Sequence, residues 1–239
     1  MPTPTPSKIA FQGLTTSLDT RVHAVRSDLA DAALIGQVAV PRFAKPMPMQ
    51  CIPPFVALRD GSSDTANQTS ELLQHEGFMV IDQSDGWAWG FCAHDHYVGY
   101  VPISALGPEI EAPLEIAGDQ IDTAKSFLDM PYVWGGRGGA GIDCSGLVQR
   151  SMAARGILAQ RDSDMQLATL GGHLTDDDLL QTGDLVFFPG HVGMMVNGVD
   201  MIHATRHYEK VVIEPLANVI ARVAAKHDKP VSARKRVFL

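Results

Sequence analysis

A glycine-rich loop that runs directly into a helical pattern headed by a cysteine is the feature that most constrains how this chain can fold. The loop, PYVWGGRGGAGID over residues 131–143, carries five glycines and no helical period, so its backbone can turn sharply and come close to a ligand. The pattern over 143–156 then repeats apolar residues at intervals of three and four, and Gly156 suits a left-handed helix end. Cys144 should therefore lie in the first turn of a helix, where backbone N–H groups and the helix dipole favour a thiolate.

The residue pattern changes over the segment 38–107 and indicates short β-strands. Five prolines between positions 41 and 54 exclude a long helix there. Runs such as PFVALR, GFMVID, GWAWGFCA and YVGYVP follow, separated by turn clusters such as DGSSD and DQSDG. A Gly-Trp pair, the YVGYV strand and a 3₁₀-prone PISAL make this segment resemble a bacterial SH3-like domain. We expect it to form a small β-barrel.

The first 37 residues are predicted to be a disordered start followed by an accessory helix. Alternating Pro and Thr open the chain, which is typical of a disordered terminus. Over residues 19–36, Val22, Val25 and Leu29 recur at helical spacing, and Gly36 could end the helix. This helix would pack on a neighbouring element.

Residues 108–239 are predicted to form a second domain with an α+β layout. A linker is expected at 107–117, and IDTAKSFLDM at 121–130 should form a helix that ends before a proline. The cysteine helix follows, and the runs DLVFFP, HVGMMV, DMIHATR and KVVIEPL then indicate strands over 184–217. Helices followed by an antiparallel sheet are an α+β arrangement.

Composition restricts the partners and the compartment. The formal charge of −8 argues against non-specific binding to nucleic acid or to anionic membranes, and no apolar run reaches the length of about 18 residues that insertion into a membrane needs. The start of the chain lacks a basic, then apolar, signal pattern, so a cytoplasmic location is expected. In a reducing cytoplasm Cys51 and Cys92 are expected to be small buried side chains. A monomer or weak homo-oligomer is expected.

A cysteine nucleophile needs a base, and two histidines are candidates. His191 begins the run HVGMMV and His203 lies in the next run, DMIHATR, so the two could be neighbours across paired strands. A two-residue turn at Asn197-Gly198 would place them on opposite faces of the sheet. We therefore predict a longer loop or a bulge between these strands.

Several motifs in one order resemble the NlpC-type cell-wall cysteine peptidases, a papain-like family. The motifs are YVWGG…DCSGLVQ, RDSDMQ, GDLVFF…HVGMMV and MIHA, which together span roughly residues 118–215. The resemblance implies that Cys144 is the nucleophile, His191 the general base and acid, and His203 the group that orients His191. It also implies that the backbone N–H of Cys144 helps to form an oxyanion hole, that Tyr132 borders the site, and that no cofactor or metal is needed.

The resemblance also implies a substrate. Members with an SH3-like domain in front cut the bond between γ-D-glutamate and a diamino acid in murein peptides with a free N-terminal L-alanine, and peptide recycling is the expected role. Four residues match the family's substrate contacts: Asp143, Ser145, Ser163 and Tyr97. Where relatives often carry a glutamate that balances the charge of the amine, this sequence has Asn67, and Glu71 is close but out of register.

Alternative interpretations remain open from sequence alone. The same Cys-His-His set could serve an acyltransferase or amidase, or the protein could be a catalytically silent murein-binding protein. Asp143 could simply be an anion that stabilises a helix N-terminus. The cluster His94–His96, HDH, is better explained as a charged loop than as a metal site.

Overall fold

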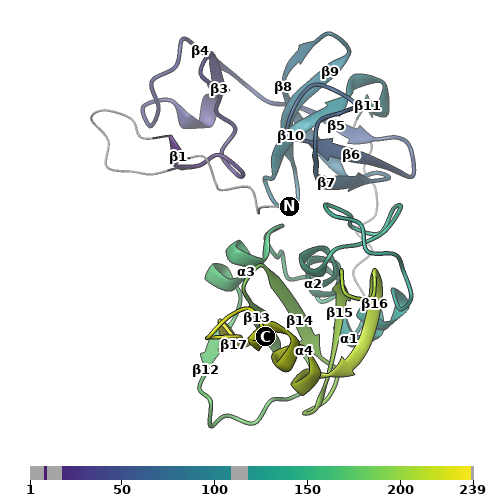
Figure 1. Ribbon diagram of the computed structural model, residues 1–239. Coiled ribbons are helices and arrows are strands. Elements are labelled where there is room, and N and C mark those ends of the chain that lie inside the picture. Colours follow the sequence, from purple (N-terminus) through teal and green to yellow (C-terminus); the bar gives the residue numbers. More distant parts are fainter. Residues whose placement is uncertain (1–7, 10–17, 109–117, 238–239) are drawn as a thin grey trace. The chain divides into compact units, whose positions relative to one another are not determined.

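The computed structural model describes residues 8–9, 18–108 and 118–237, and it divides the chain into two compact units, Met1–Pro113 and Leu114–Leu239 (Figure 1). The linker predicted at 107–117 lies mostly outside the described residues. Each unit has its own sheet and its own buried core.

The N-terminal unit is built on a seven-stranded antiparallel sheet with the order β11-β5-β8-β9-β10-β6-β7. Its strands are β5 (Met47–Cys51), β6 (Phe55–Arg59), β7 (Gln68–Leu73), β8 (Gly77–Ser84), β9 (Trp87–Cys92), β10 (Val98–Pro102) and β11 (Leu106–Pro108). The predicted 3₁₀ turn is confirmed as η2 (Ile103–Ala105). Among the described residues no pairing between β11 and β7 closes this order, so the predicted barrel is not confirmed.

The accessory helix predicted over residues 19–36 is wrong. The structure has instead β2 (Leu18–Asp19), which pairs with β1 (Lys8–Ile9), then β3 (Leu29–Asp31) and η1 (Ala32–Leu34), while β4 (Arg42–Ala44) pairs with β3 in parallel. The backbone makes a single helical turn after Asp19 and then leaves the helix.

The apolar residues of this segment are divided between two cores, which explains the error. Val25 and Leu34 pack in a small cluster with Val38, whereas Leu29 packs against Trp89 of the seven-stranded sheet. One helix face could not serve both clusters, so tertiary packing overrides the helical spacing.

Arg26 fixes the segment to the sheet. Its guanidinium lies 4.5 Å from the centre of the Trp89 ring and 2.5 Å from a carboxylate oxygen of Asp82 on β8. A cation on an aromatic face that also has a carboxylate partner is a specific anchor. The segment 18–44 is therefore tied to the SH3-like sheet through a residue that the helical pattern did not single out.

The C-terminal unit confirms the α+β layout. Its helices are α1 (Gln120–Ser126), α2 (Cys144–Ala153), α3 (Ser163–Thr169) and α4 (Leu216–Ala224). Its six-stranded antiparallel sheet has the order β12-β17-β13-β14-β15-β16. These strands are β12 (Gly172–Leu174), β13 (Leu185–Phe188), β14 (His191–Met195), β15 (Asp200–Thr205), β16 (Lys210–Pro215) and β17 (Ala233–Arg236).

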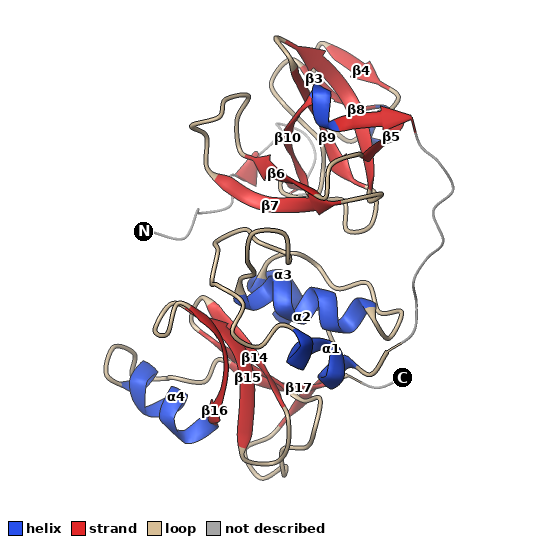
Figure 2. Ribbon diagram, turned by 90° about the vertical axis from the view of Figure 1, so that its right-hand side faces the viewer, coloured by secondary structure: helices blue, strands red, loops and turns tan. Residues whose placement is uncertain are grey.

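Alternation along the central strands gives this sheet two buried faces. Val192 and Met194 of β14 pack in the larger core with Leu147 of α2, while Met195 packs with Leu216 of α4 in a smaller core. Figure 2 shows α1 and α2 together on one side of the sheet, with α4 apart from them. No helix in the described part of the chain has the length and apolar composition to cross a bilayer.

Candidate active site

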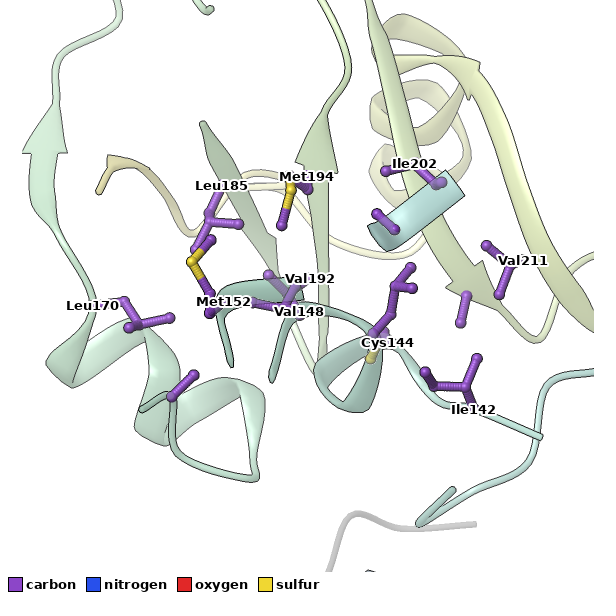
Figure 3. Close-up of a cluster of buried hydrophobic side chains, with 14 of the residues drawn as sticks. Ile142, Cys144, Val148, Met152, Leu170, Leu185, Val192, Met194, Ile202 and Val211 are labelled. Atoms are coloured by element: carbon purple, nitrogen blue, oxygen red, sulfur yellow. The ribbon is translucent and has the colours of Figure 1, made fainter. Parts of the chain in front are cut away.

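Cys144 is the first residue of α2 and lies at the edge of the larger core. Its side chain is buried, 5% exposed, and belongs to the same packed cluster as Val192 (Figure 3). The glycine-rich loop approaches it closely: a Cβ added to Gly146 would lie 2.4 Å from the carbonyl oxygen of Gly136. The loop backbone thus approaches the helix itself, and this contact requires glycine in the first turn of the helix. The approach of the loop to a ligand stays a prediction.

The protonation state of Cys144 differs from the sequence expectation. Burial raises the pKa of the thiol to about 12, and the neighbouring charge of Asp143 acts in the same direction. Hydrogen bonds from the backbone N–H groups of Val192 and Ser145, and the charge of Arg161, oppose this shift but are outweighed. The helix start therefore does supply the N–H groups that favour a thiolate, yet burial keeps the resting thiol protonated.

Three residues separate the last bonded pair between β14 and β15, Val196 and Asp200, which agrees with the longer loop that the register argument predicted. Met194 pairs with Ile202 and Met195 with Met201, and the N–H of Val196 donates to the oxygen of Asp200 across Asn197–Val199. In each pair the two residue numbers sum to 396, which is an even number. His191 and His203 consequently point to the same face of the sheet.

The two histidines form a hydrogen-bonded chain that ends on a glutamate. His191 Nε2 lies 2.7 Å from His203 Nδ1, and His203 Nε2 lies 2.9 Å from Glu214 Oε1. Arg222 of α4 contacts the same carboxylate. Glu214 is on β16, next to β15, and is buried together with His203.

This chain determines which nitrogen of His191 is the base. A carboxylate only accepts hydrogen bonds, so Nε2 of neutral His203 carries its proton toward Glu214 and Nδ1 keeps its lone pair. That lone pair accepts from Nε2–H of His191, which leaves Nδ1 of His191 as the unprotonated nitrogen. Burial first, and the neighbouring charges of His203 and Arg222 next, lower the pKa of His191 to about 3, so both imidazoles rest neutral.

The thiol lies against the backbone at the beginning of β14. The residue that follows His191, Val192, donates its backbone N–H to the sulfur, and the Asp143 charge acts on the pKa of both Cys144 and His191. The structure thus brings the cysteine to the strand end that carries the predicted base. Transfer of a proton between Cys144 and His191 remains a prediction.

Asp143 is saturated with hydrogen bonds. Its carboxylate accepts five, from the N–H groups of Gly135 and Gly146, the hydroxyl of Ser145 and both terminal nitrogens of Arg161. Arg161 is fully buried, and this bidentate contact neutralises the aspartate. Asp143 therefore caps α2 and holds the glycine-rich loop, which is the structural role that the sequence left open for it.

The remaining predicted substrate contacts fall into two groups. Ser145 lies one residue after Cys144 and also accepts from Arg161, and Ser163 begins α3 and is half-buried. Tyr132 pairs through its backbone with Ile142 and packs against the cluster that contains Cys144.

The other candidates belong to the N-terminal unit. Tyr97, just before β10, remains a prediction as a substrate contact. Asn67 is bound to Asp60 through its backbone and its side-chain amide, and Glu71 is a buried acid on β7.

Sequence reasoning missed several polar side chains. Glu214 and Arg222 behind the histidines, and Arg161 beside Asp143, were not singled out. Glu214 could have been found once the register of β15 against β16 was known, because His203 pairs with Val212 and a period of two then places Glu214 on the same face. Arg161 opens the RDSDMQ motif, two residues before Ser163.

Two other sequence expectations concern cysteines and metal ligands. Cys51 and Cys92 are both buried, as predicted. Over residues 18–108 and 118–237 no three side chains of His, Cys, Asp or Glu converge in a way that could hold a metal ion.

Comparison with known proteins identifies both domains. Residues 129–227 match the NlpC/P60 family, and residues 58–106 match the bacterial dipeptidyl-peptidase SH3 domain. A crystal structure of an NlpC/P60 family protein from Bacillus cereus is similar, with a TM-score of 0.45 and 24% identity over 80% of this chain and 64% of that chain.

Two curated relatives carry the same name. A gamma-D-glutamyl-L-lysine dipeptidyl-peptidase from Bacillus cereus is 39% identical over 114 residues, covering 44% of this chain and 34% of the relative. One from Bacillus subtilis is 34% identical over 130 residues, covering 51% and 41%. The chain thus spans well under half the length of these relatives. The segment that matches the NlpC/P60 family contains Cys144, His191 and His203, and the segment that matches the bacterial SH3 domain precedes it in the chain.

Proposed function

We propose that this protein is a cysteine peptidase that hydrolyses the γ-D-glutamyl–diamino acid amide of murein peptides. One observation carries the proposal: the chain from His191 through His203 to Glu214 leaves the basic nitrogen of His191 at Nδ1, on a strand that begins beside the Cys144 sulfur. A buried thiol next to a base of fixed tautomer is the arrangement that covalent acyl transfer requires.

The reaction follows from the neutral resting pair. His191 Nδ1 takes the thiol proton as the sulfur attacks the γ-carbonyl carbon, so that charge develops only together with the new S–C bond. Backbone N–H groups at the start of α2 stabilise the oxyanion. The tetrahedral species collapses, the C–N bond breaks, and His191 gives its proton to the leaving amine. A water molecule, deprotonated by the same nitrogen, then attacks the thioester, and the sulfur leaves as the thiol.

The finer part of the proposal concerns the substrate. The names of the relatives support a γ-D-glutamyl–diamino acid bond as the one that is cleaved. The free N-terminal L-alanine is implied by the resemblance of the sequence motifs to the family. Because Arg161 neutralises Asp143, we assign Asp143 to ordering the pocket, and Ser145, Ser163 and Tyr97 to direct contact with the peptide end. Soluble muropeptides, which possess that free amine, are the proposed substrates, in keeping with a role in peptide recycling.

Mass spectrometry of products tests the proposal. The protein, and its Cys144→Ala variant as control, are incubated with L-Ala-γ-D-Glu–diamino acid peptides, with N-acetylated copies, with intact sacculi and with an acyl ester. We expect release of L-Ala-γ-D-Glu from the free peptides only, and none with the variant. Cleavage of the ester alone would favour an acyltransferase or esterase, and equal cleavage of the acetylated peptide would contradict the role of the amine.

A further inference from the structure

Arg206 stands out because it lies beside the proposed active site without an acidic partner. It is the first residue after β15, three positions beyond His203, and it is exposed. Arg161, Arg222, Arg234 and Arg236 of the same unit form ion pairs with Asp143, Glu214, Asp176 and Asp184 respectively. Within the described residues no ion pair with a carboxylate is found for Arg206.

Aromatic rings hold the Arg206 guanidinium in place. Its central carbon lies 5.6 Å from the centre of the Tyr132 ring and 5.1 Å from that of Trp134. A side-chain hydrogen bond also links Arg206 to the Tyr132 hydroxyl. A guanidinium has five N–H donors, so the others stay available for a planar anion. Trp134 itself is 39% exposed, so this small aromatic surface is open to solvent.

The support beneath Arg206 is connected to the nucleophile. The N–H of Tyr132 donates to the oxygen of Glu209, which fixes the β15–β16 turn against the glycine-rich loop. The backbone of Tyr132 pairs with Ile142, two residues before Cys144, and its side chain packs on the cluster that contains Cys144.

We propose that Arg206, stacked on Tyr132 and Trp134, binds a carboxylate of the peptide substrate next to the cleaved amide. This inference rests on the proposed function. A γ-D-glutamyl–diamino acid bond is flanked by two carboxylates, the α-carboxyl of the glutamyl residue and the carboxyl of the diamino acid, and a guanidinium binds either as a planar bidentate partner. Arg206 then selects peptides with that acid in place over those in which it is amidated.

The test compares three forms of one tripeptide: the parent, a copy with the glutamyl α-carboxyl as carboxamide, and a copy with the diamino-acid carboxyl as carboxamide. kcat/KM is measured for the wild type, Arg206→Gln and Arg206→Lys. Lys226→Gln is the matched control, because it removes one exposed cation just beyond α4, on the other face of the sheet from α2. Thermal unfolding of each variant accompanies the kinetics.

We expect Arg206→Gln to lose roughly 10- to 100-fold in kcat/KM on the parent, mainly through KM, as for a lost charge-assisted hydrogen bond. One carboxamide copy lacks the carboxylate that Arg206 binds. On that peptide, kcat/KM of the wild type should fall by a similar factor, and kcat/KM of Arg206→Gln should equal that of the wild type. Which carboxamide behaves in this way identifies the acid. Arg206→Lys should fall between the two, and Lys226→Gln should match the wild type throughout.

Two outcomes would overturn this inference alone. In the first, Arg206→Gln retains wild-type kinetics on all three peptides. In the second, its kcat/KM falls by the same factor on all three and its melting temperature is lower, which would show that Arg206 only stabilises the packing of the aromatic rings. Failure of the wild type to cleave any of the peptides would instead overturn the proposed function, and this inference with it.

Discussion

Glu214 is the residue on which the electrostatics of the site depend, although it does not touch the proposed nucleophile. It accepts from His203 and is held by Arg222, so a buried carboxylate compensated by an arginine sets the proton positions of two imidazoles in series. Removing its charge would free His203 to turn or to change tautomer, and His191 could then present a protonated Nδ1 to the thiol.

Glu214→Gln should therefore lower kcat by roughly 10- to 100-fold while KM changes little, the range expected for a lost hydrogen bond to a charged group. The amide keeps the shape of the side chain but can present either an acceptor or a donor to His203. The pH profile of kcat should shift with it, which a purely structural defect would not produce. An unchanged profile and rate would exclude an orienting role for Glu214.

Stability should depend on pH through the buried histidines. Their pKa values are lowered to about 3 from the ordinary 6.5, so the unfolded chain binds more protons between these values. The contribution of the two histidines to the free energy of unfolding should be complete above about pH 6.5 and should decrease as the pH drops toward 3. Denaturant titrations of wild type and His203→Gln test this: the variant should show a shallower acid slope, and equal slopes would contradict the neutral buried pair.

The Cys144 thiol should make stability depend on pH in the opposite direction. Its pKa is raised from 9 to about 12, so its contribution to stability is present below about pH 9 and is lost as the pH rises toward 12. In the absence of substrate the thiol should react slowly with iodoacetamide at neutral pH. Cys144→Ala should flatten the alkaline limb, and rapid neutral alkylation of Cys144 in the wild type would contradict a protonated resting thiol.

At the scale of the element, the start of α2 is where the glycine-rich loop and the helix are fitted together. Asp143 accepts from both the loop and the helix, and Gly146 leaves room for the carbonyl of Gly136. The position of Cys144 thus depends on a backbone contact that a single methyl group would disturb.

Gly146→Ala should move Cys144 and reduce activity far more than stability explains, because the new Cβ would lie 2.4 Å from a carbonyl oxygen; the cost in stability is about 1–3 kcal/mol. Gly156→Ala, at the other end of the helix, is the matched control. That glycine has a positive φ of 72° and open space, so alanine there should cost about 1 kcal/mol with normal activity. Equal loss of activity in both would show that helix stability, not the fit at the cysteine, matters.

The elements also show how far the sequence could lead. The cysteine helix, the strands β13 to β16 and the shared face of His191 and His203 could be predicted, because local periods and register parity determine them. The residues that complete the network could not, because Glu214 and Arg161 meet their partners only through tertiary packing. The helix predicted over 19–36 was wrong for the same reason, because the apolar residues of this segment pack in two separate cores.

At the scale of the whole molecule, two units with separate cores carry different parts of the proposed function. Cys144, His191 and His203 all belong to the C-terminal unit, whereas Tyr97 and Glu71 belong to the N-terminal unit. Since Arg161 already neutralises Asp143, recognition of a free ammonium needs acceptors besides that carboxylate. The Tyr97 hydroxyl is one proposed acceptor.

Tyr97→Phe in the full chain should therefore raise KM about tenfold for a peptide with a free N-terminal amine, the cost of one hydrogen bond to a charged group, and leave kcat near normal. Tyr100→Phe, on β10 of the same sheet, is the control for removal of a hydroxyl group. Steady-state kinetics with free and N-acetylated peptides distinguish the two, and an unchanged KM in Tyr97→Phe would exclude the hydroxyl as an amine contact.

The central claim is that the Cys144 sulfur forms a thioester with the γ-glutamyl group. Acid quenching during turnover, followed by mass spectrometry of the digested protein, measures this directly. We predict an L-Ala-γ-D-Glu adduct on the peptide that contains Cys144, absent from Cys144→Ala and more abundant when deacylation is slowed. Normal turnover by Cys144→Ala, or an adduct on another residue, would contradict the account.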